Sequence, residues 1–344
     1  MRSTIALWIG LDFAAEAWSS LGQSRARFLS STAAAFLSSA AVGAVEQCQA
    51  ASWIQQVMDQ TAAAINSGTD DSFVNSFTNN PRYLDQELQM KFGDGPDGNP
   101  RTRGVLVRRI TGDATPFEFP VREVSLVKEW PETPPFSPED FFRADSNDDG
   151  WFYTVPKLVY HIDEPAVASL TQYYRNNIPK GSNILDICSS WVSHYPLEFP
   201  DTMKNICATG INPLELQFND QLTGGYKAAD LNKIPKLPYD DNSFDVVTCV
   251  VSIDYLVDPV TVLKEVHRVL RPGGQVIVSQ SNRCFPSKAI AMWLKMNDRQ
   301  HLELINAYFQ YAGGFQPRQA FDITATMPDN SYRDPMFIVK AIKA

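Results

Sequence analysis

Several features that mark common protein classes are missing from this sequence. Its five cysteines contain no C-x-x-C pair, the usual spacing of a zinc site, and their odd number argues against a disulfide framework. Because three of them lie in or at the end of expected strands, we predict buried free thiols in a reducing compartment and no metal site. The net charge of -9 argues against an extended nucleic-acid-binding surface. No serine occupies a G-x-S-x-G turn, which argues against a hydrolase of that type.

A long hydrophobic run is also absent. Residues 28–45 carry no charge, but small side chains dominate them, so this run is short and weakly hydrophobic for a membrane span. The surrounding residues 1–51 are rich in Ala and Ser, contain arginines but few acids, and include the cleavage-like Val42-Gly43-Ala44. We predict a targeting segment over residues 1–51, removed from a mature chain that has no stable membrane span. An ordinary N-terminal amphipathic helix is the alternative.

What the chain does contain is ample material for a globular core, with 44% hydrophobic residues in 344. Phe244 to Val251 is a near-continuous β-branched run, typical of a parallel strand that is buried on both faces. Asp258 and Pro259 then predict the start of a helix, which Arg271-Pro272-Gly273-Gly274 ends. Gln275 to Ser279 is a second strand, so the whole stretch predicts a β-α-β crossover.

Other segments extend this pattern on both sides. A helix is expected from Pro165. Three further buried strands are expected at Asn183–Cys188, Asn205–Thr209 and Tyr226–Ala229, and a final antiparallel pair at Ala320–Thr326 and Met336–Ile342. The antiparallel ending differs from that of a dinucleotide dehydrogenase.

The region 52–155 is expected to be an irregular N-terminal lobe. Proline-rich and turn-forming segments interrupt it, although Val105 to Ile110 is a candidate strand. Asp145 to Gly150 imitates the opening of a calcium loop, with oxygen-bearing side chains at alternate positions. The twelfth position is Pro156 instead of a bidentate Glu, so we interpret this segment as a solvated turn.

The acidic turn before Phe244 and the helix that ends in V-L-R-P-G-G resemble the class I, Rossmann-like S-adenosylmethionine-dependent methyltransferases of the type 11 group. The turn S-S-W-V-S-H-Y-P, the stretch G-I-N-P-L-E-L and V-S-Q-S-N-R look like a divergent subgroup of plants, algae and cyanobacteria. The resemblance runs from about Phe152 to the C-terminus. It implies an α/β domain over residues 156–344 with a seven-stranded sheet of order 3-2-1-4-5-7-6.

The same resemblance implies S-adenosylmethionine as cofactor and methyl transfer to an unidentified small or medium-sized acceptor. A catalytically inactive Rossmann-like binding or assembly protein is the alternative. It also implies the plastid as the address of the targeting segment, with the mitochondrion or cytoplasm as alternatives. A small-molecule substrate is the expected partner, and nucleic acid is not.

The turn after the first expected strand departs from the family, in which it is rich in glycine. Glycines allow close approach of the cofactor and positive φ angles, but their three positions here hold Cys188, Ser190 and Val192. Asp186 matches the family carboxylate that holds the methionine ammonium group.

Three more side chains in this turn are implied as cofactor contacts. Ser189 and Ser190 offer hydroxyls to the methionine carboxylate. Trp191 either walls the cofactor pocket or fills it, and both interpretations fit the sequence.

The remaining cofactor residues implied by the resemblance follow the second, third and fourth strands: Gly210, Asn212, Asp230, Leu231, Val251 and Ser252. Gly210 stands where the family has an acid that binds the ribose diol, and losing such a charged partner costs on the order of 1.5 to 3 kcal/mol. Asn212 is the candidate substitute. Asp230 matches an acid near the adenine amino group, and a strand-end cap is the alternative for it.

Catalytic candidates lie beyond the fourth strand, at the edge where open parallel sheets bind ligands. Asp254 is the candidate general base that takes a proton from the acceptor. Tyr255, His194 and Asn282 are candidate substrate contacts. Alternatively, Asp254 simply caps the segment that follows.

Overall fold

The computed structural model describes residues 83–94, 100–110, 118–327 and 332–344, all within the compact unit Phe77–Ala344. The predicted targeting segment lies outside the described residues and stays a prediction. The main sheet is built from β3 (Arg122–Val124), β4 (Asn183–Ile187), β5 (Asn205–Gly210), β6 (Gly225–Ala228), β7 (Phe244–Val250), β8 (Leu270–Gln280), β9 (Gln319–Asp322) and β10 (Phe337–Ile342).

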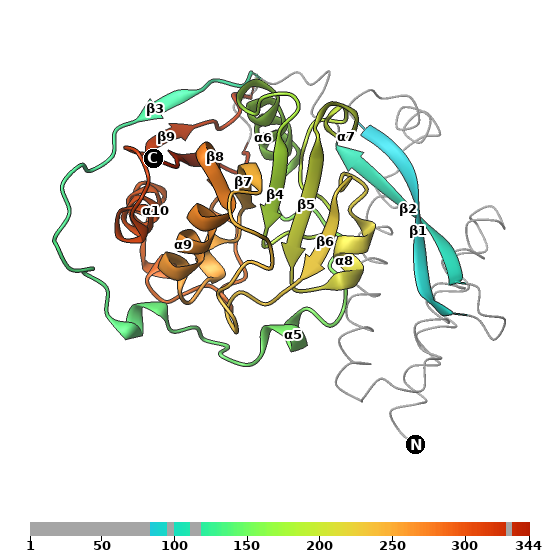
Figure 1. Ribbon diagram of the computed structural model, residues 1–344, viewed down its shortest axis with the longest axis horizontal. Helices are drawn as coiled ribbons and strands as arrows, with labels where there is room; N and C mark the ends of the chain where they lie inside the picture. The colour runs from blue at the N-terminus through green and yellow to red at the C-terminus, as the bar shows by residue number, and fades with distance from the viewer. Residues whose placement is uncertain (1–82, 95–99, 111–117, 328–331) are drawn as a thin grey trace. The chain divides into compact units, whose positions relative to one another are not determined.

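These strands follow the order β3-β9-β10-β8-β7-β4-β5-β6, as Figure 1 shows. Strands β4 to β8 pair in parallel, while β10 runs antiparallel to β8 and to β9. Without β3, this is the predicted order 3-2-1-4-5-7-6. The Rossmann-like α/β fold, including its antiparallel ending, is therefore confirmed.

The predicted strand number of seven is wrong, because the sheet has eight strands. Strand β3 pairs antiparallel with β9, with Arg122 opposite Asp322 and Val124 opposite Ala320. An edge strand exposes unpaired backbone N–H and C=O groups, and β3 covers those of β9. Three residues give too little periodicity for the strand to be recognised in the sequence. The division at residue 155 stays a prediction, although the pairing of β3 with β9 crosses it.

A separate antiparallel hairpin consists of β1 (Tyr83–Asp94) and β2 (Pro100–Ile110). Its register places Tyr83 opposite Ile110 and Lys91 opposite Thr102. The expected strand Val105–Ile110 is thus part of a longer one, and the region predicted to be irregular contains more regular structure than expected.

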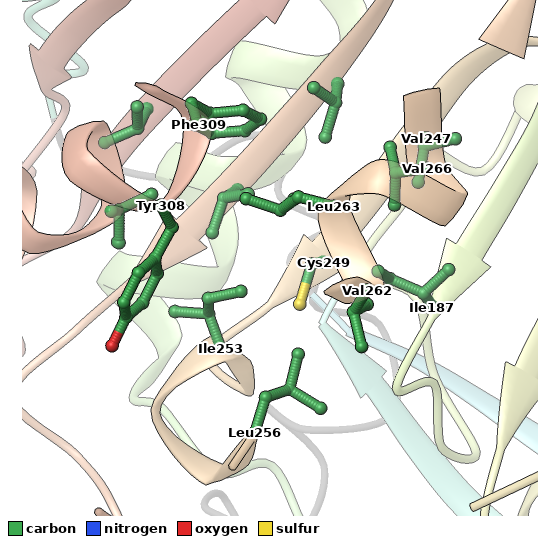
Figure 2. Packing of buried hydrophobic residues seen from close by; sticks show 14 of the residues in the cluster. Ile187, Val247, Cys249, Ile253, Leu256, Val262, Leu263, Val266, Tyr308 and Phe309 are labelled. Carbon is green, nitrogen blue, oxygen red and sulfur yellow. The ribbon is translucent and has the colours of Figure 1, made fainter. Parts of the chain in front are cut away.

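The helices cover the sheet on two faces. One face packs against α9 (Pro259–Val269) and α10 (Asp298–Ala312), and the other against α6 (Glu164–Asn177) and α7 (Phe199–Thr202). Figure 2 shows the first of these clusters, in which Val247 and Cys249 of β7 meet α9 and α10. Side chains alternate between the two faces of a strand, so Val246, which precedes Val247, belongs to the second cluster on the other face of the sheet. None of the helices among the described residues has the length and apolar character to cross a membrane.

The start of α9 confirms the predicted cap. Asp258 is its N-cap, and its carboxylate accepts a hydrogen bond from the Thr261 N–H at 3.1 Å. The shorter helices are α5 (Asp149–Phe152), α8 (Pro213–Phe218), η1 (Pro138–Phe141), η2 (Ile253–Tyr255) and η3 (Trp293–Lys295).

Residues 138–161, called the arm below, lie across the carboxyl ends of the parallel strands. Hydrogen bonds join the arm to the loops that follow β4, β5, β6 and β8, and one example from each loop is Trp191 Nε1 to Val159 O at 3.1 Å, Asn212 Nδ2 to Tyr153 O at 2.6 Å, Asn232 Nδ2 to Asp149 Oδ2 at 2.9 Å, and Ala291 N to Phe142 O at 2.7 Å. Ligands of open parallel sheets bind at this edge, so the arm covers the expected site.

A buried ion cluster fastens the arm. The Lys288 side chain is 2% exposed, and its Nζ lies 3.0 Å from Asp145 and 3.1 Å from Asp149. Arg143 donates to both oxygens of Asp149, at 2.8 and 2.9 Å. The interpretation of Asp145 to Gly150 as a solvated turn is therefore wrong at Asp149, which is 4% exposed. One of its two cations, Lys288, comes from a distant part of the chain, which no local pattern indicates.

Replacing the buried cation should loosen this cluster. In Lys288→Met the carboxylates of Asp145 and Asp149 lose a charged partner, so we expect the free energy of unfolding to fall by about 3 kcal/mol in urea titrations. The exposed Lys295 on η3 provides the control, and Lys295→Met should change stability by less than about 0.5 kcal/mol. Equal stability of the two variants would contradict the role of the cluster.

Candidate functional site

The Asp186 carboxylate lies at the end of β4 inside a ring of hydroxyl groups. Ser189 Oγ and Ser193 Oγ each donate to its Oδ2 at 2.6 Å, and Thr248 Oγ1 donates to its Oδ1 at 2.9 Å. The residue is 2% exposed, and this burial raises the pKa of Asp186 to about 6 although the three hydrogen bonds oppose the shift. The strand-end carboxylate is present, and protein groups already occupy both of its oxygens.

The turn after Asp186 keeps a glycine-like backbone without glycine. Cys188, at the first of the three glycine positions, has φ of 54°, and Val251 at the end of the neighbouring β7 has φ of 37°. Residues other than glycine rarely adopt positive φ angles, and each one that does so reduces the stability of the fold by on the order of 1 to 2 kcal/mol. Strained backbone therefore lies at the carboxyl ends of two adjacent strands, a place where proteins concentrate strain for function.

Ser190 and Trp191 connect this turn to other elements. Ser190 Oγ donates to Glu215 of α8 at 2.5 Å, and Glu215 is 3% exposed. The Trp191 indole is 4% exposed and packs edge-on against Tyr160 of the arm at 5.1 Å between ring centroids. Together with its hydrogen bond to Val159 O, this packing makes Trp191 the contact between the β4 turn and the arm.

Neither Gly210 nor Asn212 offers the free polar side chain that was expected to bind the ribose. A Cβ atom on Gly210 would lie 2.1 Å from the Ser189 carbonyl oxygen, so no acid fits at this position. The Asn212 side chain caps α8 by accepting from the N–H groups of Leu214 and Glu215, and it donates to Tyr153 O. Its amide oxygen thus has two protein partners, and its nitrogen donates one of its two N–H groups to the arm.

The residues after β6 and β7 have mainly local partners. Asp230 Oδ1 accepts from the Asn232 N–H at 2.9 Å, as the alternative of a strand-end cap requires. Leu231 is 5% exposed and belongs to the core. Val251 N donates to Ser279 O at 2.9 Å, and Ser252 Oγ donates to Val250 O at 2.6 Å.

The catalytic candidates separate into two places. Asp254 and Tyr255 form η2 beyond β7, and Phe285 N donates to the Tyr255 hydroxyl at 2.8 Å. Asp254 is 3% exposed, burial raises its pKa well above the ordinary range, and its Oδ2 has no hydrogen-bond partner. His194 follows β4 and lies 5.6 Å from the Tyr160 ring, with its carbonyl accepting from Thr171.

Sequence reasoning missed three residues that hold the site together. Ser193 completes the hydroxyl ring, Glu215 receives the Ser190 hydroxyl, and Asn232 joins the arm to the β7 loop by donating to Asp149 and to Tyr255 O. Only Ser193, seven residues after Asp186, gave a local signal. The partners of the other two are distant in the sequence.

The polar set along this edge suits an adenosyl amino acid in its chemistry. The carboxylates of Asp186 and Asp230 match an ammonium and an amine, and the amide of Asn212 matches a sugar hydroxyl. For Asp186 and Asn212, binding has to replace protein donors and acceptors, including the arm carbonyl of Tyr153. Among the described residues, no group of three or more His, Cys, Asp or Glu side chains is arranged to hold a metal ion.

Residues 189–278 match the family model described as a methyltransferase domain. A demethylmenaquinone methyltransferase of Staphylococcus epidermidis is 32% identical over 114 residues, covering 31% of this chain and 46% of that enzyme. The enzyme of the same name from Listeria welshimeri is 30% identical over 144 residues, covering 39% and 54%. The chain thus spans about half the length of these relatives. A solved SAM-dependent methyltransferase of Aquifex aeolicus aligns over 61% of this chain and 100% of its own, with 13% identity and a TM-score of 0.39.

The strained turn yields a stability test. Cys188→Gly removes the Cβ atom that disfavours positive φ, whereas Cys188→Ala removes the same thiol and keeps the Cβ. We expect the Gly variant to be more stable than the Ala variant by about 1 kcal/mol in chemical denaturation. The reverse order would show that the turn does not hold Cys188 in the left-handed region.

The raised pKa of Asp186 yields a pH test. The folded protein binds the Asp186 proton more tightly than the unfolded chain does. The stability that this proton contributes is therefore present below pH 3.8, the ordinary pKa, and is lost as pH rises to the folded-state pKa of about 6. Wild type should therefore lose stability relative to Asp186→Asn across that window, by at most about 1.4 kcal/mol per pH unit. Urea unfolding at several pH values measures the difference, and parallel curves for both proteins would contradict the raised pKa.

Proposed function

We propose that this chain is an S-adenosylmethionine-dependent methyltransferase acting on a small or medium-sized acceptor. The observation that carries the proposal is the methyltransferase-domain match over residues 189–278, which begins just after Asp186 and includes Asn212 and Asp230 of the polar set at the carboxyl edge. The names of the relatives support methyl transfer, and demethylmenaquinone is one candidate acceptor to assay. The reversed final strand β10 supports the same class over a dehydrogenase.

The cofactor, when bound, supplies a methyl group on a sulfonium that a nucleophile can attack in line. In this proposal Asp186 would hold the ammonium group in place of the hydroxyls of Ser189 and Ser193, and Asn212 would offer its amide to the ribose. Asp230 would be the residue for the adenine end. The arm, which lies across this edge, would exclude water from the bound molecule.

The role of Asp254 follows from its protonation. Burial raises its pKa well above the ordinary range, which favours the protonated carboxyl as a hydrogen-bond donor, and the group accepts a proton only after ionisation. Tyr255 and His194 remain the proposed substrate contacts. We also keep as proposals the subgroup of plants, algae and cyanobacteria and the plastid as destination, because the relatives above are bacterial and the targeting residues are not described.

Calorimetry tests the cofactor without any acceptor. We expect S-adenosylmethionine and S-adenosylhomocysteine to bind the wild type, and Asp186→Asn to bind at least about tenfold more weakly because a charged hydrogen bond is lost. Asp201→Asn on the exposed side of α7 is the matched control and should bind like wild type. If millimolar ligand produces no binding heat with the wild type, the proposal fails.

A further inference from the structure

Three buried side chains near the carboxyl ends of β7 and β8 lack hydrogen-bond partners. Gln280, the last residue of β8, is 1% exposed, and neither its Oε1 nor its Nε2 is bonded. Ser281 is 2% exposed with an unbonded Oγ, and Asp254 is 3% exposed with an unbonded Oδ2. More than nine in ten buried polar groups in native proteins find a partner, so this group of atoms calls for a ligand.

The sheet brings these residues to one edge. Val250 of β7 is paired in parallel with Ser279 of β8, and the Val251 N–H donates to Ser279 O. Gln280 and Ser281 therefore begin just beyond the last paired residues of the two strands, and Asp254 lies three residues beyond Val251.

Gln280 and Asp254 also share a face. Val276 and Val278 belong to the cluster beneath α9 and α10, so the two-residue period places Gln280 on that face. Tyr308 belongs to the same cluster. Its pKa is raised mainly by burial and, as the second cause, by the nearby Asp254 carboxyl. Figure 2 shows Tyr308 in this cluster together with Ile253, the residue before Asp254.

The cluster around Gln280 and Asp254 is apolar and provides no cation that could pair with an anion. Among the described residues, no cation pairs with Asp254. Lys288 is paired with Asp145 and Asp149, and Arg283 lies 2.7 Å from Asp334. An anionic acceptor would therefore be buried beside the Asp254 carboxyl with no cation to match it, which is unfavourable by several kcal/mol in general.

We propose that Gln280 and Asp254, together with the neighbouring Ser281, form the recognition site for the polar end of the methyl acceptor, and that this acceptor is an apolar molecule with a hydroxyl group and no negative charge. The Gln280 amide offers one donor and one acceptor, which is the complement of a hydroxyl, and Ser281 and Asp254 supply further hydrogen bonds. Describing the ligand as the acceptor rests on the proposed methyltransferase function. The site itself does not depend on it.

A stability comparison tests whether Gln280 is unsatisfied. Gln280→Met keeps the side-chain volume and removes the unbonded amide, so the thermal midpoint should rise by about 3 °C or more. Gln275 on the same strand is the matched control, because its Nε2 donates to Asn177 O at 2.8 Å, and Gln275→Met should lower the midpoint. A lower midpoint in both variants overturns the proposal, since Gln280 would then have a partner.

Binding of 2-naphthol, measured by calorimetry without S-adenosylmethionine, tests the ligand class. We expect the wild type to bind 2-naphthol at least about tenfold more tightly than 2-naphthoate, and Gln280→Met to lose about tenfold in affinity for 2-naphthol. Equal binding by wild type and Gln280→Met, or a preference for the carboxylate, overturns the site. A wild type that binds 2-naphthol but not S-adenosylmethionine keeps the site and removes only the proposed cofactor.

Discussion

The attraction between buried Lys288 and the carboxylates of Asp145 and Asp149 fixes the arm across the carboxyl ends of the sheet. A buried ion without a partner is far more costly than one that is paired, so these charges have to stay together or move into water together. The other arm contacts depend on this closure. Asn212 and Trp191 reach backbone carbonyls only where the arm lies against the loops.

The residues proposed to bind the cofactor already have protein partners while the arm lies across this edge. Hydroxyl groups donate to the Asp186 carboxylate, and the Asn212 amide donates to a carbonyl of the arm. Exchanging one hydrogen-bond partner for another has a small net free energy, about 1 kcal/mol, whereas leaving a buried group unpaired costs more. A ligand that replaces these partners one for one can therefore compete with them, although the glycine-rich turn and the ribose acid of the family are absent.

Sequence reasoning recovered the parts of the fold that depend on local regularity. The β-branched run at Phe244–Val250 and the Asp258 cap were predicted because burial and capping act over a few residues. It did not recover β3 or the pairing of Asp149 with Lys288. Both depend on a partner that is more than one hundred residues away, and neither three residues of strand nor a string of aspartates identifies that partner.

The candidate site shows the same division. Asp186 was identified from its place at the end of a strand. Its hydroxyl ring, however, includes Thr248 of β7, which lies opposite Asp186 only because of the register between β4 and β7. The missing ribose acid has a physical reason that the sequence does not reveal. The backbone of Ser189 passes so close to Gly210 that any side chain would collide with it.

Two buried carboxyl groups at one edge of the sheet thus have opposite surroundings. Asp186, on the face of α6, has both oxygens bonded by hydroxyls, while Asp254 has an oxygen with no partner, and the amide of Gln280 is also unbonded. Burial disfavours the charged form of both groups, but only the first has hydrogen bonds that offset it. Asp186 can therefore hold a cation by exchanging hydroxyls, whereas an anion beside Asp254 would have no cation to match it. In the two proposals above, the first face binds the charged methyl donor and the second binds an acceptor without negative charge.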